Sequence, residues 1–287
     1  MNIPARALVF VVMAISPCCW APRVMAQDTP AATTALSEPI SIPNTASSPF
    51  EKMATNCLET GGEYRALTNG FGSWSGGYVR GVLGTGKDIL NGEVSGQHEF
   101  GDAGTYFALG DTHNFTANTY ASLTLGSSAG AFFFPRFRGD AFVNQKWLER
   151  KQLITTIGFG YYAAKDPHRD RNFSLGTIYY FKRPWILEDG VRFNVSNPGG
   201  VFSPSAFVAL TQGRNKQHYI TGRVGYGQEA YQLIGPTDLL SSFRSRTVTI
   251  TWRQWIGSNW GVNGVADYYG NPYYTRAGTT LGLFREF

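Results

Sequence analysis

The chain ends in a segment whose apolar and polar residues alternate, as they do in a β-strand with one apolar face. Within residues 276–287, one face carries Leu281, Leu283 and Phe287, and the other carries Thr280, Gly282 and Glu286. A strand at the edge of a sheet leaves unpaired N–H and C=O groups, and lipid cannot satisfy them. If the apolar face contacts lipid, the last strand must pair with the first. The segment therefore predicts a closed β-barrel.

The residue that ends this strand is aromatic. Phe287, at the end of an amphipathic strand, resembles the signal by which bacterial outer-membrane barrels are recognised for insertion. Arg285 occupies a position where such signals usually carry an apolar residue, but its long side chain can reach the headgroups. The sequence thus predicts that Phe287 is an insertion signal and that the barrel-assembly machinery binds the C-terminal strand.

The N-terminal residues carry the pattern of an export signal. Arg6 supplies a positive charge, residues 7–15 form a short apolar stretch, and Val24-Met25-Ala26 offers small residues before Gln27. Nine residues are too few to cross a bilayer as a helix, which disfavours an anchor. We expect residues 1–26 to be a signal peptide cleaved near Ala26, and the mature protein to lie in the bacterial outer membrane.

The cysteines exclude a disulfide framework. Cys18 and Cys19 fall inside the expected signal peptide, where they leave a lipoprotein alternative that the preceding Pro17 disfavours. Cys57 is then the only cysteine of the mature chain, so neither an intramolecular disulfide nor a cysteine metal cluster can form.

The composition also favours a barrel. A mean hydropathy of −0.19 excludes a bundle of membrane helices, yet 34 glycines and 15% aromatic residues accompany only 16% charged residues. A barrel combines an apolar outer face, a polar lumen and aromatic residues at the membrane interfaces. Averaged over the chain, these parts give a mean hydropathy near zero with many glycines and aromatic residues and few charges. The net charge of +5 is compatible with anionic lipid or an acidic polysaccharide, and equally with basic loops near lipid phosphates.

The chain divides into three parts. Residues 27–60 are rich in Ala, Thr, Ser and Pro, with little charge, and we expect a disordered periplasmic lead-in. From residue 61 the texture changes to short alternating segments separated by Gly, Asn, Asp and Pro. We therefore expect a signal peptide over 1–26, the lead-in over 27–60 and the barrel over 61–287.

Several segments alternate in the manner of barrel strands. The clearest are residues 90–100, 153–162, 173–181 and 247–253. In the second of these, Leu153, Ile157 and Phe159 would face lipid, and Gly158 and Gly160 would face inward. An immunoglobulin-like sandwich would alternate similarly, but the export signal, the terminal aromatic residue and aromatic pairs at strand ends favour an antiparallel up-and-down barrel. About twelve strands are expected, with ten to fourteen as alternatives.

Four segments of the chain are similar to one known family. They are Phe134–Phe142, Ile157–Tyr162, Asn172–Tyr180 and Tyr274–Phe284. These runs resemble the YaiO family of outer-membrane β-barrels over roughly residues 61–287. The resemblance implies an outer-membrane barrel, which in some members is associated with envelope polysaccharide production or export. It provides no catalytic motif.

The histidines give weak support for an enzyme. His113 follows Asp111 at a spacing that could fix the imidazole tautomer for acid–base chemistry at a barrel rim. His98 falls on the apolar parity, His168 lies in a polar turn, and His218 begins a strand. No serine sits in a Gly-x-Ser-x-Gly context. We expect no catalytic residues, no metal and no cofactor.

Charged residues of both signs are expected in the lumen. By strand parity, the inward-facing residues include Glu93, Glu99, Arg192, Arg223 and Arg253. Such a lumen can be a selective pore or a core filled by paired side chains. The leading hypothesis is a channel or export-associated barrel for saccharides or similar solutes. The alternatives are a non-conducting structural or adhesive barrel and, third, a lipid-modifying enzyme that uses Asp111 and His113.

The expected partners follow from the membrane location. They are outer-membrane lipid and lipopolysaccharide, the barrel-assembly machinery and a saccharide solute. Basic residues are scattered along the sequence rather than gathered in aromatic-lined patches, which excludes nucleic acid as a partner.

Overall fold

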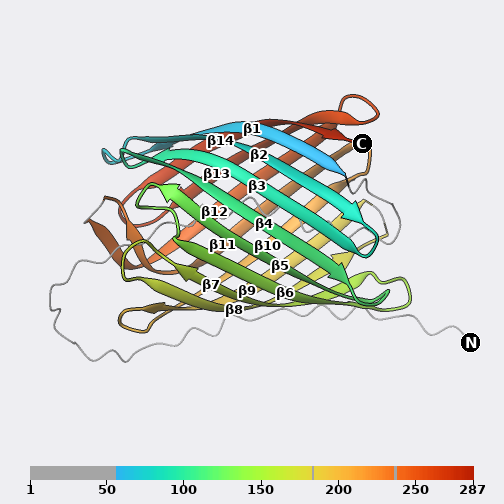
Figure 1. Ribbon diagram of the computed structural model, residues 1–287, viewed down its shortest axis with the longest axis horizontal. Helices are drawn as coiled ribbons and strands as arrows, with labels where there is room; N and C mark the ends of the chain where they lie inside the picture. The colour runs from blue at the N-terminus through green and yellow to red at the C-terminus, as the bar shows by residue number, and fades with distance from the viewer. Residues whose placement is uncertain (1–55, 183, 236–237) are drawn as a thin grey trace, which may run out of the picture.

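The computed structural model describes residues 56–182, 184–235 and 238–287, which form fourteen β-strands (Figure 1). The strands are β1 (Cys57–Leu67), β2 (Ser73–Thr85), β3 (Asp88–Glu99), β4 (Asp102–Asn114), β5 (Thr119–Gly130), β6 (Phe137–Trp147), β7 (Leu153–Ala163), β8 (Arg169–Tyr180), β9 (Trp185–Asn197), β10 (Val201–Arg214), β11 (His218–Leu233), β12 (Leu239–Trp255), β13 (Trp260–Gly270) and β14 (Thr275–Glu286). Among the described residues, no helix is long and apolar enough to cross a membrane. The expected signal peptide and most of the lead-in lie outside the described residues.

The strands form one closed barrel in which each pairs antiparallel with its neighbours along the chain, and β14 pairs with β1. The predicted all-β up-and-down barrel is confirmed. The count of fourteen is two above the central expectation of about twelve and equals the upper alternative, because the connections are short. They run from two residues, at Gly86 and Lys87, to six, at residues 131–136. The first strand begins at Cys57, four residues before the change of texture at residue 61.

The two ends of the barrel differ. β1 begins and β14 finishes at the same end, which we call the base, and Figure 1 shows the C-terminus there. We call the opposite end the mouth; it carries the connections 68–72, 131–136, 164–168, 234–238 and 271–274, together with the short turns at 100–101 and 198–200.

Side chains alternate between the outer face and the lumen. On β7, Ile157 and Phe159 are exposed on the outside, whereas Ile154 and Tyr162 are buried on the inside, as the sequence predicted for this strand. Most of the exposed large side chains of the barrel are apolar, as they must be on a surface that contacts lipid. Aromatic side chains gather near the base on the outer face, and they include Phe115, Trp147, Trp185 and Trp260. This arrangement is typical of the aromatic belt at a membrane interface.

The seam between β1 and β14 depends on glycine. Eleven residue pairs join the two strands, and Gly61 is the partner of Gly282. A Cβ at Gly61 would lie 2.6 Å from Tyr78 Oη, and a Cβ at Gly282 would lie 2.7 Å from the same atom. Both glycines therefore leave room on the lumen side for the ring of Tyr78, which covers the seam from β2.

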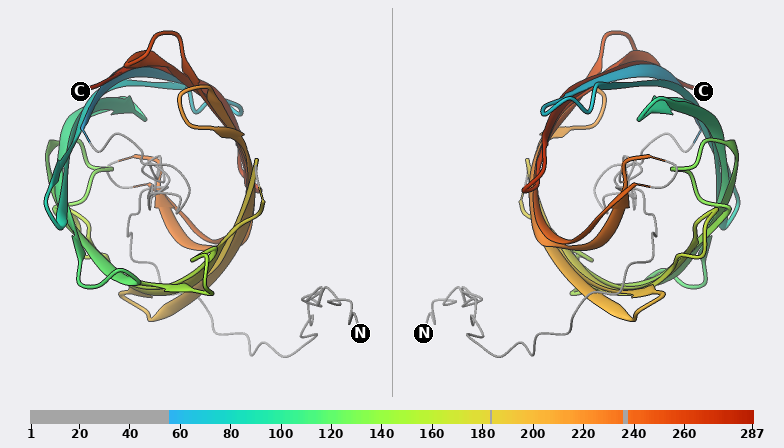
Figure 2. Two further views of the ribbon diagram at one scale, coloured as in Figure 1. Left: turned by 90° about the vertical axis from the view of Figure 1, so that its right-hand side faces the viewer. Right: turned by 90° about the vertical axis from the view of Figure 1, so that its left-hand side faces the viewer.

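β11 and β12 are the longest strands, and their mouth ends leave the barrel wall. Their pairing is interrupted once, between Glu229↔Phe243 and Tyr231↔Ser241. At this interruption Ser242 has φ of 48°, a left-handed conformation that is uncommon for a residue other than glycine. Beyond it, both strands curve from the wall toward the barrel axis (Figure 2). We call the described residues from Ala230 to Ser242 the inner hairpin.

The seam gives a first test. We expect Gly61→Val to lower the free energy of unfolding by about 1–3 kcal/mol, because the new side chain would overlap Tyr78 and the backbone of β14. The measurement is urea unfolding in detergent micelles, in which the folded fraction is determined from the heat-modifiable migration of the barrel on gels.

The matched control is Gly62→Val on the same strand. Gly62 faces outward, and the nearest atom to a Cβ there is Gly76 O at 3.5 Å, an ordinary contact. Equal destabilisation by both substitutions would contradict the role assigned to Tyr78 at the seam.

Candidate functional site

A chain of charges crosses the lumen wall from β1 to β3. Glu59, Arg80 and Glu93 are register partners on these strands. Arg80 Nε donates to Glu93 Oε2 at 2.9 Å, and Arg80 Nη1 lies 3.7 Å from Glu59 Oε1. Tyr78 Oη also donates to Glu59 Oε1, at 3.1 Å. The carboxylates are thus held by a guanidinium and a phenol rather than left free in the lumen.

Arg253 extends this network across the closing seam. It starts from β12 and donates from Nη1 to Glu59 Oε2 at 3.1 Å. On the way its guanidinium lies 3.5 Å from the ring centroid of Phe284, a cation–π contact. Gly261 leaves the space that the Phe284 ring fills, because a Cβ there would come within 2.6 Å of that ring. Arg253 therefore joins β12 to β1 over the two intervening strands.

A second charged group lies nearer the mouth. Arg65 Nη1 lies 2.8 Å from Glu63 Oε2, and Arg65 Nε donates to Asp267 Oδ1 at 3.1 Å. The guanidinium of Arg276 lies between Trp74, at 4.6 Å, and Tyr269, at 5.0 Å, measured to the ring centroids. This places a buried cation against two aromatic faces inside the barrel.

Several polar atoms in this second group have no hydrogen-bond partner among the described residues. They are Arg276 Nε and Nη1, Trp74 Nε1, Asp267 Oδ2, Gln97 Oε1 and Gln232 Oε1. Two of these atoms form an ion pair with each other, because Arg276 Nε lies 3.7 Å from Asp267 Oδ2. Arg276 is 8% exposed, Trp74 1% and Gln232 0%. Buried polar groups are normally paired, so donors and acceptors remain available here for a ligand with hydroxyl groups.

The inner hairpin reaches from the barrel wall into the mouth over this group (Figure 2). Tyr231 Oη donates to Asp170 Oδ1 of β8 at 3.0 Å, and the Tyr231 ring lies 3.9 Å from that of His168, measured between centroids. Gln232 Nε2 donates to Tyr274 Oη in the connection between β13 and β14. The hairpin is thus attached to two distant parts of the wall. We call the contacts of Tyr231 and Gln232 the latch.

Apolar packing supports the latch. Leu240 and Phe243 form a buried cluster with Tyr269 and Tyr274, and Phe71 packs against it from the first connection at the mouth. Burial raises the pKa of Tyr274, which lies outside the strands, so its hydroxyl stays protonated in neutral solution.

The connection 131–136 covers another part of the mouth. Phe133 and Phe134 are buried there. Phe134 stacks on the inward-facing Tyr106, with ring centroids 5.8 Å apart, and Tyr162 Oη donates to Phe133 O at 3.4 Å. Phe132 N donates to Asp102 Oδ2, which fixes the course of the segment. The mouth is therefore narrowed from two sides.

The five residues expected in the lumen all occupy inward-facing positions. Glu93 and Arg253 belong to the network near the base, and Glu99, which is 2% exposed, lies close enough to Arg276 and Arg65 to interact electrostatically. Farther along the wall, on β9–β11, Arg223 stacks over Phe207 at 3.7 Å from the ring centroid. There Arg192 is the register partner of residues 174 and 205. That these side chains line a conducting path stays a prediction.

The terminal residue expected as an insertion signal also lies on the barrel. Phe287 is 67% exposed at the base, and its N–H donates to Asn56 O at 3.2 Å. Its recognition by the assembly machinery stays a prediction.

The histidines fall into different places. His113 Nδ1 pairs with Asp88, not with Asp111, because positions 88 and 113 are register partners. This pair lies at the base and faces outward, so Asp111 and His113 do not form the expected pair at an extracellular rim. His98 is exposed on the outer face. The part of the chain that the structure describes holds no group of residues suited to a metal ion.

Sequence reasoning missed the latch. His168 was interpreted as a solvated turn residue, but it is 4% exposed and bonds Asp166 as well as stacking on Tyr231. Tyr231 is more than sixty residues from Asp170 and His168 in sequence, and Gln232 is 42 residues from Tyr274. Only the unusual length of the two strands that flank residues 234–238 could have indicated a hairpin that leaves the wall.

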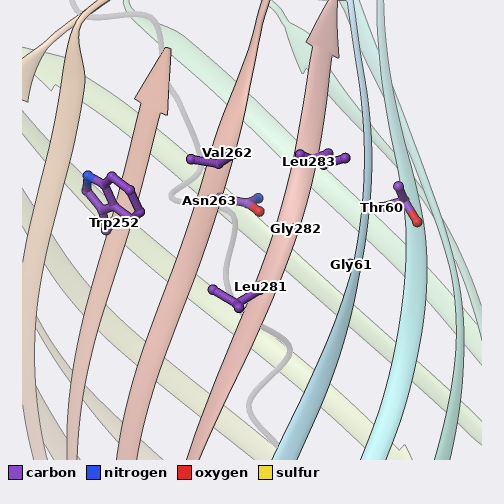
Figure 3. A pocket seen from close by; sticks show the side chains of 8 residues that line it. All are labelled: Thr60, Gly61, Trp252, Val262, Asn263, Leu281, Gly282 and Leu283. Carbon is purple, nitrogen blue, oxygen red and sulfur yellow. The ribbon is translucent and has the colours of Figure 1, made fainter. Parts of the chain in front are cut away.

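Two shallow grooves mark the outer face. The larger, of about 480 Å³, lies over the seam (Figure 3) and is lined by Trp252, Val262, Leu281 and Leu283, among others. The second, of about 370 Å³, lies over β5–β8. Neither opens into the lumen group described above, so both are features of the lipid-facing surface.

Comparisons with known proteins agree with this architecture. The model of the YaiO membrane beta barrel domain matches residues 55–232. No curated protein matches the sequence. Among solved structures, the CymD monoaromatic hydrocarbon channel has a TM-score of 0.59 at 6% identity, covering 82% of this chain and 89% of that chain.

Two further structures share the fold. The toluene transporter TodX of Pseudomonas putida has a TM-score of 0.55 at 11% identity, covering 90% of this chain and 95% of that chain. A bacterial polysaccharide outer membrane secretin has a TM-score of 0.51 at 9% identity, covering 83% of this chain and all of that chain. At these identities the likeness concerns the barrel fold alone.

The charge network gives a second test. We expect Glu59→Gln to lower the free energy of unfolding by about 1–3 kcal/mol, because Arg253 loses its nearest carboxylate while it stays partly buried. Arg80 keeps Glu93 and is less affected. Denaturant unfolding in micelles measures the change, and Glu149→Gln in the exposed connection 148–152 is the control. Equal stability of the two variants would contradict a structural role for the network.

Proposed function

This chain belongs to the YaiO membrane β-barrel family, and we propose that it is a gated outer-membrane channel whose mouth is closed by the inner hairpin. The observation that carries the proposal is the bend at Ser242, which takes two wall strands into the mouth. A hairpin that continued along the wall would leave the mouth wider. The mouth lies opposite the end where β1 begins and β14 finishes. It would face the exterior, as in other bacterial barrels whose first and last strands meet at the periplasmic end.

The latch is weak enough to open. Tyr231 and Gln232 each make one side-chain hydrogen bond in the latch, and a protein hydrogen bond contributes about 1 kcal/mol net. The residue at the bend pays a conformational cost in the closed state. Closed and open arrangements separated by a few kcal/mol would both be populated, and a solute that binds the open one would favour it.

We propose saccharides, including chains of envelope polysaccharide, as the solutes. Sugar rings present apolar C–H faces and hydroxyls that both donate and accept. Trp74, Tyr269 and Tyr274 offer aromatic faces with polar tips. Beside them, Arg276 Nη1 and Gln232 Oε1 are a donor and an acceptor without a hydrogen-bond partner among the described residues. A mixed array of this kind fits a polyhydroxylated solute better than an apolar one.

The apolar cluster of Leu240, Phe243 and Phe71 favours a second candidate, the passage of small apolar molecules. CymD and TodX are named for such solutes. In this reading the unpaired polar atoms beneath the hairpin would have no use, so we rank it second. A barrel that inserts and never conducts would support the structural alternative.

The bend gives a test of gating. We expect Ser242→Val to raise the open fraction roughly fivefold, because a β-branched residue tolerates a positive φ poorly and about 1 kcal/mol changes a two-state ratio by that factor. Ser242→Gly should lower the open fraction, since glycine adopts this conformation freely. The measurement is single-channel recording in planar bilayers with protein purified from outer membranes. Identical open fractions in the native protein and the two variants would contradict the proposed gate.

The saccharide is tested in the same bilayers. We expect a neutral linear oligosaccharide to block the current of the Ser242→Val channel, and Trp74→Leu in that background to weaken the block about tenfold. The matched control is Trp252→Leu, because Trp252 is a tryptophan of the outer face. If Trp74→Leu leaves the oligosaccharide block unchanged and the channel passes toluene, the result would favour the apolar candidate.

A further inference from the structure

The groove over β5–β8 has a floor of small residues. On the outward-facing positions of β6, Gly139 and Ala141 lie between the larger Phe137 and Val143, both of which are exposed. Leu123 and Phe159 are the register partners of Ala141 and form the two walls. The missing side chains on β6 thus produce an apolar trough of about 370 Å³ that runs along the lipid-facing surface.

An aromatic residue and an arginine mark the end of this trough nearest the mouth. Tyr161 is the register partner of Gly139, and Arg171 is the register partner of Tyr161. Tyr161 and Arg171 both line the groove. Tyrosine on the outer face near a strand end is typical of the level of lipid headgroups. The trough therefore extends from the headgroup level into the depth where acyl chains lie.

Positive charge gathers at that end. Arg169 lies one step closer to the mouth on the same outward face of β8 as Arg171, and both are exposed. Among the described residues, neither guanidinium has a hydrogen-bond or ion-pair partner. Two further cations lie in the neighbouring connections at the mouth, where Arg136 Nη2 donates to Lys165 O at 2.8 Å.

The nearby carboxylates do not neutralise these arginines. Asp170 lies between them in sequence but points into the lumen, where it accepts the hydrogen bond of Tyr231. Asp140 faces inward and accepts from Arg138 Nε at 2.6 Å, and Asp166 is paired with His168. The outward-facing surface at this point consequently carries an excess of positive charge.

We propose that this groove binds a phosphorylated glycolipid of the outer leaflet, with one acyl chain in the trough and a phosphate on Arg171 and Arg169. Guanidinium groups bind phosphate oxygens through paired, charge-assisted hydrogen bonds. A trough without arginines would accept any acyl chain, and arginines without a trough would bind any anion. Their alignment along one line selects a molecule that carries both groups.

The groove at the seam provides an internal comparison. Its lining contains no charged residue, and it lies toward the base, as shown by Val262 and Leu283 close to the base ends of their strands. It has the apolar part of the proposed site without the cationic part. The proposal therefore concerns the β5–β8 groove alone and does not depend on whether the barrel conducts.

The test compares lipid binding by the whole barrel and by outward-facing variants. Detergent-purified protein is titrated with bis-phosphorylated lipid A, and bound lipid is counted by native mass spectrometry. The same lipid without its phosphates and phosphatidylethanolamine are titrated in parallel. We expect the native barrel to prefer the phosphorylated lipid about tenfold or more, and Arg171→Gln with Arg169→Gln to remove that preference.

Filling the trough tests the acyl part. A Cβ at Gly139 would lie 3.4 Å from Leu125 Cδ2, so Gly139→Leu is accommodated without backbone strain and occupies the groove. We expect it to weaken binding of both lipid A forms about tenfold. The controls are Gly264→Leu, whose Cβ would lie 3.5 Å from Leu281 Cδ2 on the outer face near the seam, and Arg246→Gln, an exposed outward arginine on β12.

The outcomes separate the sources of affinity. Equal loss with Arg246→Gln and with the paired β8 variant would mean diffuse attraction to anions and would overturn the site. Loss with the β8 arginines but none with Gly139→Leu would leave a phosphate contact without a lipid groove and would also overturn the proposal. A preference for phosphatidylethanolamine over lipid A would do the same. Folding of each variant is checked by heat-modifiable migration.

Discussion

Pairing between β1 and β14 is the constraint on which the rest of the structure depends. In lipid, an open sheet edge would leave a full row of backbone groups without partners, so the eleven pairs of this seam decide whether the barrel exists. The local sequence is fitted to that demand. Gly61 and Gly282 remove side chains from the lumen side, Tyr78 fills the space, and Glu59 accepts both the Tyr78 hydroxyl and the Arg253 guanidinium. The polar network near the base thus also stabilises the pairing of β1 with β14.

The same closure explains why the lumen charges are paired. A charged side chain that leaves water is stabilised only by close partners, and a lumen partly filled by side chains offers less water than a wide pore. The lumen-facing arginines Arg65, Arg80, Arg253 and Arg276 all lie against carboxylates, aromatic rings or both. What distinguishes the group beneath the inner hairpin is the set of polar atoms left over after this pairing. These atoms lie beneath the inner hairpin, which we propose as the gate, so the interior polar group adjoins the proposed gate.

Period-two alternation was sufficient to predict the fold class, the facing of β7 and the inward positions of Glu93, Glu99, Arg192, Arg223 and Arg253, because each depends only on neighbouring residues in a strand. The strand number was predicted only as a range of ten to fourteen, since turn lengths of two to six residues carry little sequence signal. The pairing of His113 with Asp88 and of Tyr231 with Asp170 depends on register between strands, which alternation alone does not fix. The bend at Ser242 falls on a residue type that gives no warning of a positive φ.

β8 shows how one strand can serve both faces of the barrel. Arg169, Asp170 and Arg171 are consecutive, and the pleat sends the acid into the lumen and the two arginines outward. Asp170 holds the latch through Tyr231, whereas the arginines border the outer groove. Because adjacent side chains on a strand point to opposite faces, the arginines can be exchanged for glutamine without removing any contact of Asp170. The proposed lipid site and the proposed gate therefore share one three-residue segment, yet the geometry of the strand keeps them separable by substitution.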